Sequence, residues 1–177
     1  MPNQKPEWIG RRLLQEGLVR ANFGNMSLRA DGGFHIKRRG EFMDAAWEPV
    51  FVPFDGPVPE CASTEYPVHR DIYMNSTFDA ILHAHPPHAI ALSLLEWELL
   101  PLDSEGRLLA PRVPVVEGEP GSVELAGSVV RGLSSSPVVI ARGHGTFAAA
   151  SDLLQAYILT SVVEHSSQIL LMLLRRG

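Results

Sequence analysis

The longest apolar stretch of the chain, Leu153–Leu174, is the feature that most constrains its fold. Its middle carries the polar segment 164–168, which would be expensive to place inside a lipid bilayer. The stretch is therefore expected to form a long buried helix of a globular protein rather than a membrane span. We expect this helix to begin near Asp152 and to end in Arg175 and Arg176, because basic residues suit a helix C-terminus.

Length and charge narrow the class of protein. The 177 residues suffice for one domain with a sizeable core, and the net charge of −5 argues against nucleic acid as the main partner. A single cysteine, Cys61, excludes an intramolecular disulfide framework. Residues 1–10 lack the apolar core of a signal peptide. The sequence thus indicates a cytoplasmic protein that does not bind a membrane.

The remaining periodicities mix strands and helices without a regular βαβ alternation. Helices are expected over residues 7–16, 65–74, 89–95 and 123–133. Strands are expected over 25–29, 34–36, 50–52, 78–85, 113–116, 138–141 and 146–149, and near 99. Ser63 is a candidate cap for the second helix, and residues 96–121 are otherwise expected to be irregular. This order favours a layered sheet with helices on its faces over a Rossmann-type arrangement.

The strongest local motif is the H-x-H pair His83 and His85. In a strand, side chains two residues apart point to the same face, so both imidazoles can converge on one ion. A catalytic zinc site uses three protein ligands and an open position. His144 is a candidate third ligand, because its flanking glycines would let the backbone turn and approach closely. The alternative is that these are ordinary surface or core histidines.

Glu65 lies at the expected start of a helix, directly after Ser63 and Thr64. Hydroxyls and free amides at a helix N-terminus form an anion site, and a carboxylate there can act as acid/base if burial lifts its pKa. The alternative is a helix cap whose negative charge complements the helix dipole.

Four short segments, taken in order, resemble the class II aldolase/adducin family, which includes fuculose-phosphate aldolase and ribulose-phosphate epimerase. Residues 24–29 (GNMSLR) resemble its G-N-x-S-x-R motif, and residues 63–69 (STEYPVH) resemble its S-S-E-x-x-x-H motif. His83 and His85 match its H-x-H, and His144-Gly145 before the long helix matches its third ligand segment. The resemblance spans about residues 10–174.

The resemblance implies one domain over residues 1–177 with an α/β/α three-layer fold, in which a mainly antiparallel sheet lies between helices. It implies zinc on His83, His85 and His144, with Glu65 as catalytic acid/base. It also implies a homotetramer with active sites at subunit boundaries. The phosphate of the substrate would be bound at the positions Asn25, Gly40, Ser63 and Thr64. Asn25 otherwise reads as a plain turn residue.

Two departures from the family pattern bear on the reaction. The family's Thr-Pro-Ser-Gly loop is here Lys37-Arg38-Arg39-Gly40, so Arg39 replaces a phosphate-binding hydroxyl. Its guanidinium can grip phosphate bidentately, or the segment is a solvated basic turn. The family's aldolases also use a tyrosine beyond the H-x-H segment, whereas residues 74–156 contain none. Asp103 and Glu105 are candidate substitutes.

The function expected from this resemblance is cleavage of a small phosphorylated ketose by a zinc-dependent aldolase, through a metal-stabilised enediolate. Two alternatives remain. An epimerase or dehydratase acting on a sugar phosphate would use the same ligands. A non-catalytic, adducin-like assembly domain is disfavoured because the three histidines and Glu65 are all present.

Overall fold

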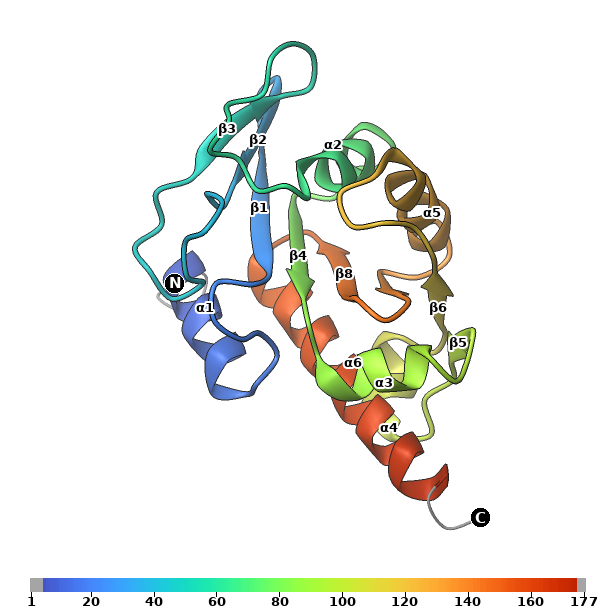
Figure 1. The fold of residues 1–177 in the computed structure, drawn as a ribbon. Helices are drawn as coiled ribbons and strands as arrows, with labels where there is room; N and C mark the ends of the chain where they lie inside the picture. Colours follow the sequence, from blue (N-terminus) through green and yellow to red (C-terminus); the bar gives the residue numbers. More distant parts are fainter. Residues whose placement is uncertain (1–4, 175–177) are drawn as a thin grey trace.

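The computed structural model describes residues 5–174, shown as a ribbon in Figure 1. The helices are α1 (Pro6–Gln15), α2 (Tyr66–Met74), α3 (Pro87–Ser93), α4 (Ser104–Leu109), α5 (Val123–Leu133) and α6 (Leu153–Leu174). The strands are β1 (Asn25–Ala30), β2 (Gly33–Ile36), β3 (Val50–Pro53), β4 (Ala80–Ala84), β5 (Glu98–Leu99), β6 (Val113–Val116), β7 (Val138–Ala141) and β8 (Gly145–Ala150).

The strands form one eight-stranded sheet in the order β3-β2-β1-β4-β8-β7-β6-β5. All neighbouring pairs are antiparallel except β6 and β7, which are parallel. The central strands β4 and β8 pair with His83 opposite Phe147, and β1 pairs with β4 so that Asn25 lies opposite His83. This register fixes which side chains share a face with His83.

Helices cover both faces of the sheet, as Figure 1 shows. On one face, alternate residues of β4 such as Leu82 pack with α1 and α6 through Ile9, Leu13 and Ala156. On the other face, Ile81 and Phe147 pack with α2 and α5. The expected three-layer α/β/α fold with a mainly antiparallel sheet is therefore confirmed.

Several element boundaries differ from the sequence-based expectation by one or two residues, and three differences concern α2, β4 and α4. Helix α2 begins at Tyr66 with Glu65 as its cap residue, so Ser63 is not the cap. Strand β4 ends at Ala84, one residue before His85. Helix α4, within the segment expected to be irregular, is short and is capped by Asp103, whose carboxylate accepts from the Gly106 amide at 2.8 Å. A single polar cap on a helix of one to two turns gives too little periodicity to be detected.

The long helix α6 packs along β4 and β8, as expected for a core helix. By length and composition alone it would pass as a membrane span. However, its first four turns bury Leu153, Val163 and even Ser166 and Ser167 against the protein. The expected basic end of this helix lies outside the described residues.

Candidate active site

His83 occupies the centre of the sheet and points to the face covered by α2 and α5. Its ring is buried, stacks on Phe147 with ring centroids 4.2 Å apart, and donates from Nδ1 to the carbonyl oxygen of Thr146 at 2.9 Å. This bond fixes the tautomer, so the Nε2 lone pair is left for a ligand.

His85 lies just past the end of β4, and its position is set by backbone contacts. Its amide donates to the carbonyl of Leu18 at 2.8 Å, and its ring lies against Phe23. Its Nε2 is 2.9 Å from Nε2 of His83. Although His85 is outside the strand, its imidazole still converges on that of His83, as the H-x-H spacing predicts.

His144 reaches the same point from the tight turn between β7 and β8. Gly143 has φ of +68°, which favours glycine, and a Cβ on Gly145 would lie 2.2 Å from the carbonyl oxygen of Ala84. The expectation that the flanking glycines permit a close backbone approach is therefore confirmed. The His144 ring centroid is 4.7 Å from that of His83 and 5.2 Å from that of His85.

The three histidines form a group that could hold a metal ion, because one ligand atom from each lies within 4.8 Å of the others. A tetrahedral ion with nitrogen ligands at roughly 2.0–2.1 Å needs nitrogens about 3.3 Å apart, so the cluster fits with small side-chain adjustments. Burial lowers the pKa of all three rings, to about 4 for His85. The rings are therefore neutral near pH 7, which is the state that ligates metals.

Glu65 lies beside this cluster with its side chain buried. Its Oε1 is 4.0 Å from Nε2 of His144, and its Oε2 accepts from the amide of Gly121 at 3.2 Å. Desolvation raises the pKa of the Glu65 carboxyl, and the Gly121 hydrogen bond partly opposes this. A carboxyl with a raised pKa next to a candidate metal site is suited to proton transfer.

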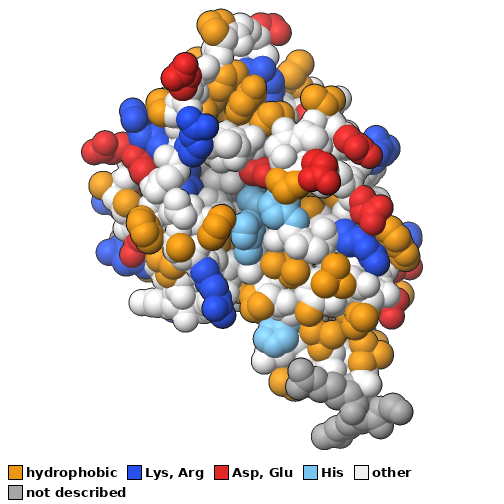
Figure 2. Space-filling model, viewed as in Figure 1, with side chains coloured by type: hydrophobic (Ala, Val, Ile, Leu, Met, Phe, Trp, Pro, Cys, Tyr) orange, Lys and Arg blue, Asp and Glu red, His pale blue; other side chains and the backbone are white. Residues whose placement is uncertain are grey.

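A cavity of about 420 Å³ opens over the histidines. All nine residues expected from the sequence line it: Asn25, Arg39, Gly40, Ser63, Thr64, Glu65, His83, His85 and His144. Figure 2 shows pale-blue histidine side chains in a hollow near the centre of this face, with an acidic side chain beside them. The structure thus brings together five segments that are far apart in the sequence.

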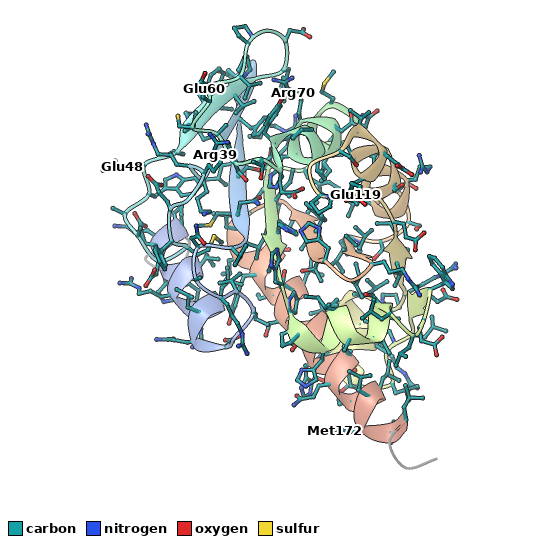
Figure 3. The ribbon with its side chains drawn as sticks, viewed as in Figure 1. Arg39, Glu48, Glu60, Arg70, Glu119 and Met172 are labelled. Atoms are coloured by element: carbon teal, nitrogen blue, oxygen red, sulfur yellow. The ribbon has the colours of Figure 1, made fainter. Side chains whose placement is uncertain are left out.

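The polar groups expected to bind phosphate differ from one another in burial and in hydrogen bonding. Asn25 is buried, and its Oδ1 has no hydrogen-bond partner within residues 5–174. The Ser63 hydroxyl accepts weakly from the Glu65 amide at 3.4 Å, and Gly40 has φ of +84°. Arg39 is exposed, and its Nη2 donates to the carbonyl of Glu60 at 2.9 Å. Figure 3 labels both residues.

Several side chains lie outside these expectations. Lys37 lines the cavity but was not among the expected site residues, because nothing in a basic tetrapeptide signals which residue is buried. Asp103 caps α4 and Glu105 bonds to Ser104, and neither lines the cavity of its own chain.

His69 belongs to a buried network beneath the cavity. The Ser27 hydroxyl lies 2.7 Å from His69 Nδ1 and 2.8 Å from the Tyr73 hydroxyl. Burial lowers the pKa of His69 to about 3, so this ring stays neutral. The network joins β1 to α2, the helix that follows Glu65, which gives His69 a structural role.

Comparisons with known proteins agree with this architecture. The family model for the class II aldolase and adducin N-terminal domain matches residues 8–171. The solved structure of L-fuculose-1-phosphate aldolase from Thermus thermophilus is similar, with a TM-score of 0.91 and 38% identity, over 94% of this chain and 91% of that one.

Two further relatives carry different names. The L-fuculose phosphate aldolase of Methanococcus maripaludis is 28% identical over 82% of this chain and 83% of its own length. The 3,4-dihydroxyphthalate decarboxylase of Arthrobacter keyseri is 31% identical over 84% of this chain and 68% of its own length. The family match covers nearly every described element, from α1 to α6. The chain belongs to the class II aldolase and adducin family.

Proposed function

We propose that the protein is a zinc-dependent aldolase that cleaves a small phosphorylated ketose. The observation that carries the proposal is the placement of three neutral histidines, a buried carboxyl and several basic and polar residues in one cavity. The relatives named as sugar-phosphate aldolases support the same reaction class.

In this proposal His83, His85 and His144 hold the ion through their free ring nitrogens. Three nitrogen ligands with an open position are typical of catalytic zinc. When bound, the ion supplies Lewis-acid stabilisation of the negative charge that develops on the substrate oxygens as the carbon–carbon bond breaks. The carbonyl of Thr146 keeps His83 in the ligating tautomer.

Glu65 is proposed as the acid/base that moves the proton at the reacting carbon. Its raised pKa places its proton affinity nearer to working pH, and its Oε1 faces His144 rather than a fixed cation. The phosphate is proposed to be bound by the side chains of Asn25, Ser63, Thr64 and Arg39 and by the backbone amide of Gly40.

The proposal includes assembly and location. Exposed apolar side chains, including Phe23 at the cavity and Leu95 and Trp97 elsewhere, support cover by further copies of the chain in a homotetramer. Figure 2 shows orange side chains gathered below the histidines.

Residues 1–177 are proposed to form one domain. A cytoplasmic location is proposed because a charged sugar phosphate does not cross a bilayer unaided.

The test is turnover of candidate phosphorylated ketoses by the metal-loaded enzyme, with identification of the products. Release of an aldehyde and a three-carbon ketose phosphate supports the proposal. Stereochemical inversion or loss of water instead would indicate an epimerase or a dehydratase. Absence of metal after reconstitution with zinc would favour an adducin-like assembly role.

A decarboxylase is the second candidate, because one relative carries that name and Arg39 stands where the family pattern has a hydroxyl. A guanidinium binds a carboxylate as readily as a phosphate. Release of carbon dioxide from a dihydroxylated aromatic acid, with no cleavage of phosphorylated ketoses, would favour this candidate over the aldolase.

A further inference from the structure

Lys37 is a buried cation in the wall of the cavity. It is the first residue after β2, its backbone amide donates to the carbonyl of Met26 at 3.1 Å, and only 5% of its surface is exposed. Lysine is among the residues least often buried without a partner. Its placement beside the cavity therefore calls for a functional explanation.

The ammonium group is held between two loops. It donates to the carbonyl of Asn22 at 3.1 Å and to the carbonyl of Glu41, on the far side of the turn that contains Gly40. An ammonium has three N–H donors, and the third has no hydrogen-bond acceptor within residues 5–174. The two carbonyls thus orient the group without saturating it.

Its charge is also left without a close counter-ion. The Glu41 carboxylate faces Arg38 at 3.9 Å, and no carboxylate of residues 5–174 forms an ion pair with Lys37. Burial lowers the pKa of Lys37 to about 8, and the charge of Glu41 only partly opposes this. An uncompensated buried ammonium is costly, so a bound anion would remove much of that cost.

The neighbours of Lys37 point to the kind of ligand. The same cavity is also lined by Arg39, Gly40 and Asn25, whose side-chain Oδ1 has no hydrogen-bond partner within residues 5–174. In Figure 3, Arg39 and Glu119 lie on opposite sides of β4.

We propose that Lys37 binds the phosphate of the substrate directly and makes this cavity selective for a doubly charged phosphate monoester over a neutral sugar. The inference rests on the proposed function and deepens it, because it assigns the substrate's charge to a particular residue. The competing interpretation is that the ammonium only ties the two loops together.

The experiment is calorimetric titration of inorganic phosphate into the metal-loaded enzyme at pH 8, in two buffers that differ in ionisation enthalpy. Bound phosphate raises the pKa of Lys37, so its binding takes up protons, and affinity falls as pH rises above about 8. Three other charged side chains lie around Lys37, those of Arg38, Arg39 and Glu41, and none of them is changed in the variants below.

Two variants and one control decide the outcome. Lys37→Met is expected to weaken phosphate binding by about 10- to 100-fold, the loss expected for a charged hydrogen bond. Lys37→Arg is expected to keep affinity within a few-fold but to abolish the lysine's share of proton uptake, and it keeps the test valid if the methionine variant does not fold. Lys5→Met removes the other lysine, which is exposed, and should change neither quantity.

Unchanged phosphate affinity in Lys37→Met, or unchanged proton uptake in Lys37→Arg, would overturn the proposal and leave the ammonium as a tether. Failure of the wild type to bind phosphate overturns it as well. Failure of the proposed function is measured separately, by turnover of phosphorylated ketoses. If the enzyme is an active aldolase but its phosphate affinity does not depend on Lys37, only this inference is refuted.

Discussion

The two ends of the cavity are built in different ways. The end proposed to bind the metal, called the metal end, consists of His83, His85, His144 and Glu65, and the end proposed to bind the anion, called the anion end, consists of Asn25, Lys37, Arg39, Gly40, Ser63 and Thr64. The metal end is fixed by the register of β4 with β8 and by close backbone packing at Gly145. The anion end is formed mainly by loops, and there the sequence departs from the family pattern. The candidate metal ligands are thus positioned by the central strands and the turns at their ends, whereas the candidate anion-binding residues lie mainly on loops, which can change without altering the sheet.

The metal end should fail completely when one ligand is removed. We expect His83→Ala to bind zinc far more weakly and to lose turnover to background, because two nitrogens do not hold the ion in place. Metal analysis after dialysis and an activity assay check this. His165→Ala, at an exposed position of α6, is the matched control and should keep both metal and activity. Full activity in the His83 variant would remove the metal end from the mechanism.

Changing the carboxyl without disturbing the ligands should separate metal binding from catalysis. Glu65→Gln keeps the size of the side chain and can still accept from the Gly121 amide. We expect zinc content to be unchanged and kcat to fall by about 10²- to 10⁴-fold, as for loss of a general acid/base. Unimpaired cleavage by this variant would exclude Glu65 as the acid/base.

The buried network of Ser27, His69 and Tyr73 beneath the metal end should contribute measurably to the free energy of unfolding. We expect His69→Gln to lower the free energy of unfolding by about 1–3 kcal/mol at pH 7, because Ser27 loses its well-placed partner. In the wild type, the unfolded chain takes up a proton on His69 below about pH 6.5, whereas the folded protein does not until about pH 3.

The contribution of the neutral His69 ring to the free energy of unfolding is therefore complete above pH 6.5 and decreases as pH falls. The decrease between pH 7 and pH 5 is about 2 kcal/mol. The variant lacks this contribution, so its stability should depend less steeply on pH. Urea unfolding of both proteins at the two pH values gives the comparison. The other buried histidines contribute equally to both proteins, and equal slopes would contradict the assignment.

The smallest effect is expected at the rim of the anion end. Arg39→Ser restores the hydroxyl of the family pattern at an exposed position, so we expect KM to rise by about three- to tenfold with kcat little changed. Steady-state kinetics on a phosphorylated ketose measure this. Arg20→Ser, at an exposed arginine that does not line the cavity, is the charge-matched control. A fall in KM would show that Arg39 hinders rather than binds the anion.

Much of this organisation could be predicted from residue patterns. Strand periodicity in residues 78–85 places His83 and Ile81 on one face, and the glycines around His144 indicate a tight turn. Both features are local, since they depend on backbone geometry and on residues adjacent in the chain. The short α4 was missed, and α2 begins later than expected, because capping by one polar residue is a weak signal.

Residue patterns indicated the three histidines, Glu65 and a layered sheet with helices, and the resemblance to the family added the phosphate-binding candidates and the three-layer arrangement. That His144, 59 residues after His85 in the numbering, completes one cluster with it depends on the folded chain, since pairing of distant strands fixes that distance. The same is true of the contrast between the buried Lys37 and the exposed Arg39. The two side chains have the same charge and lie in the same turn, so their difference arises from the loops that pack around them, a property that no local pattern contains.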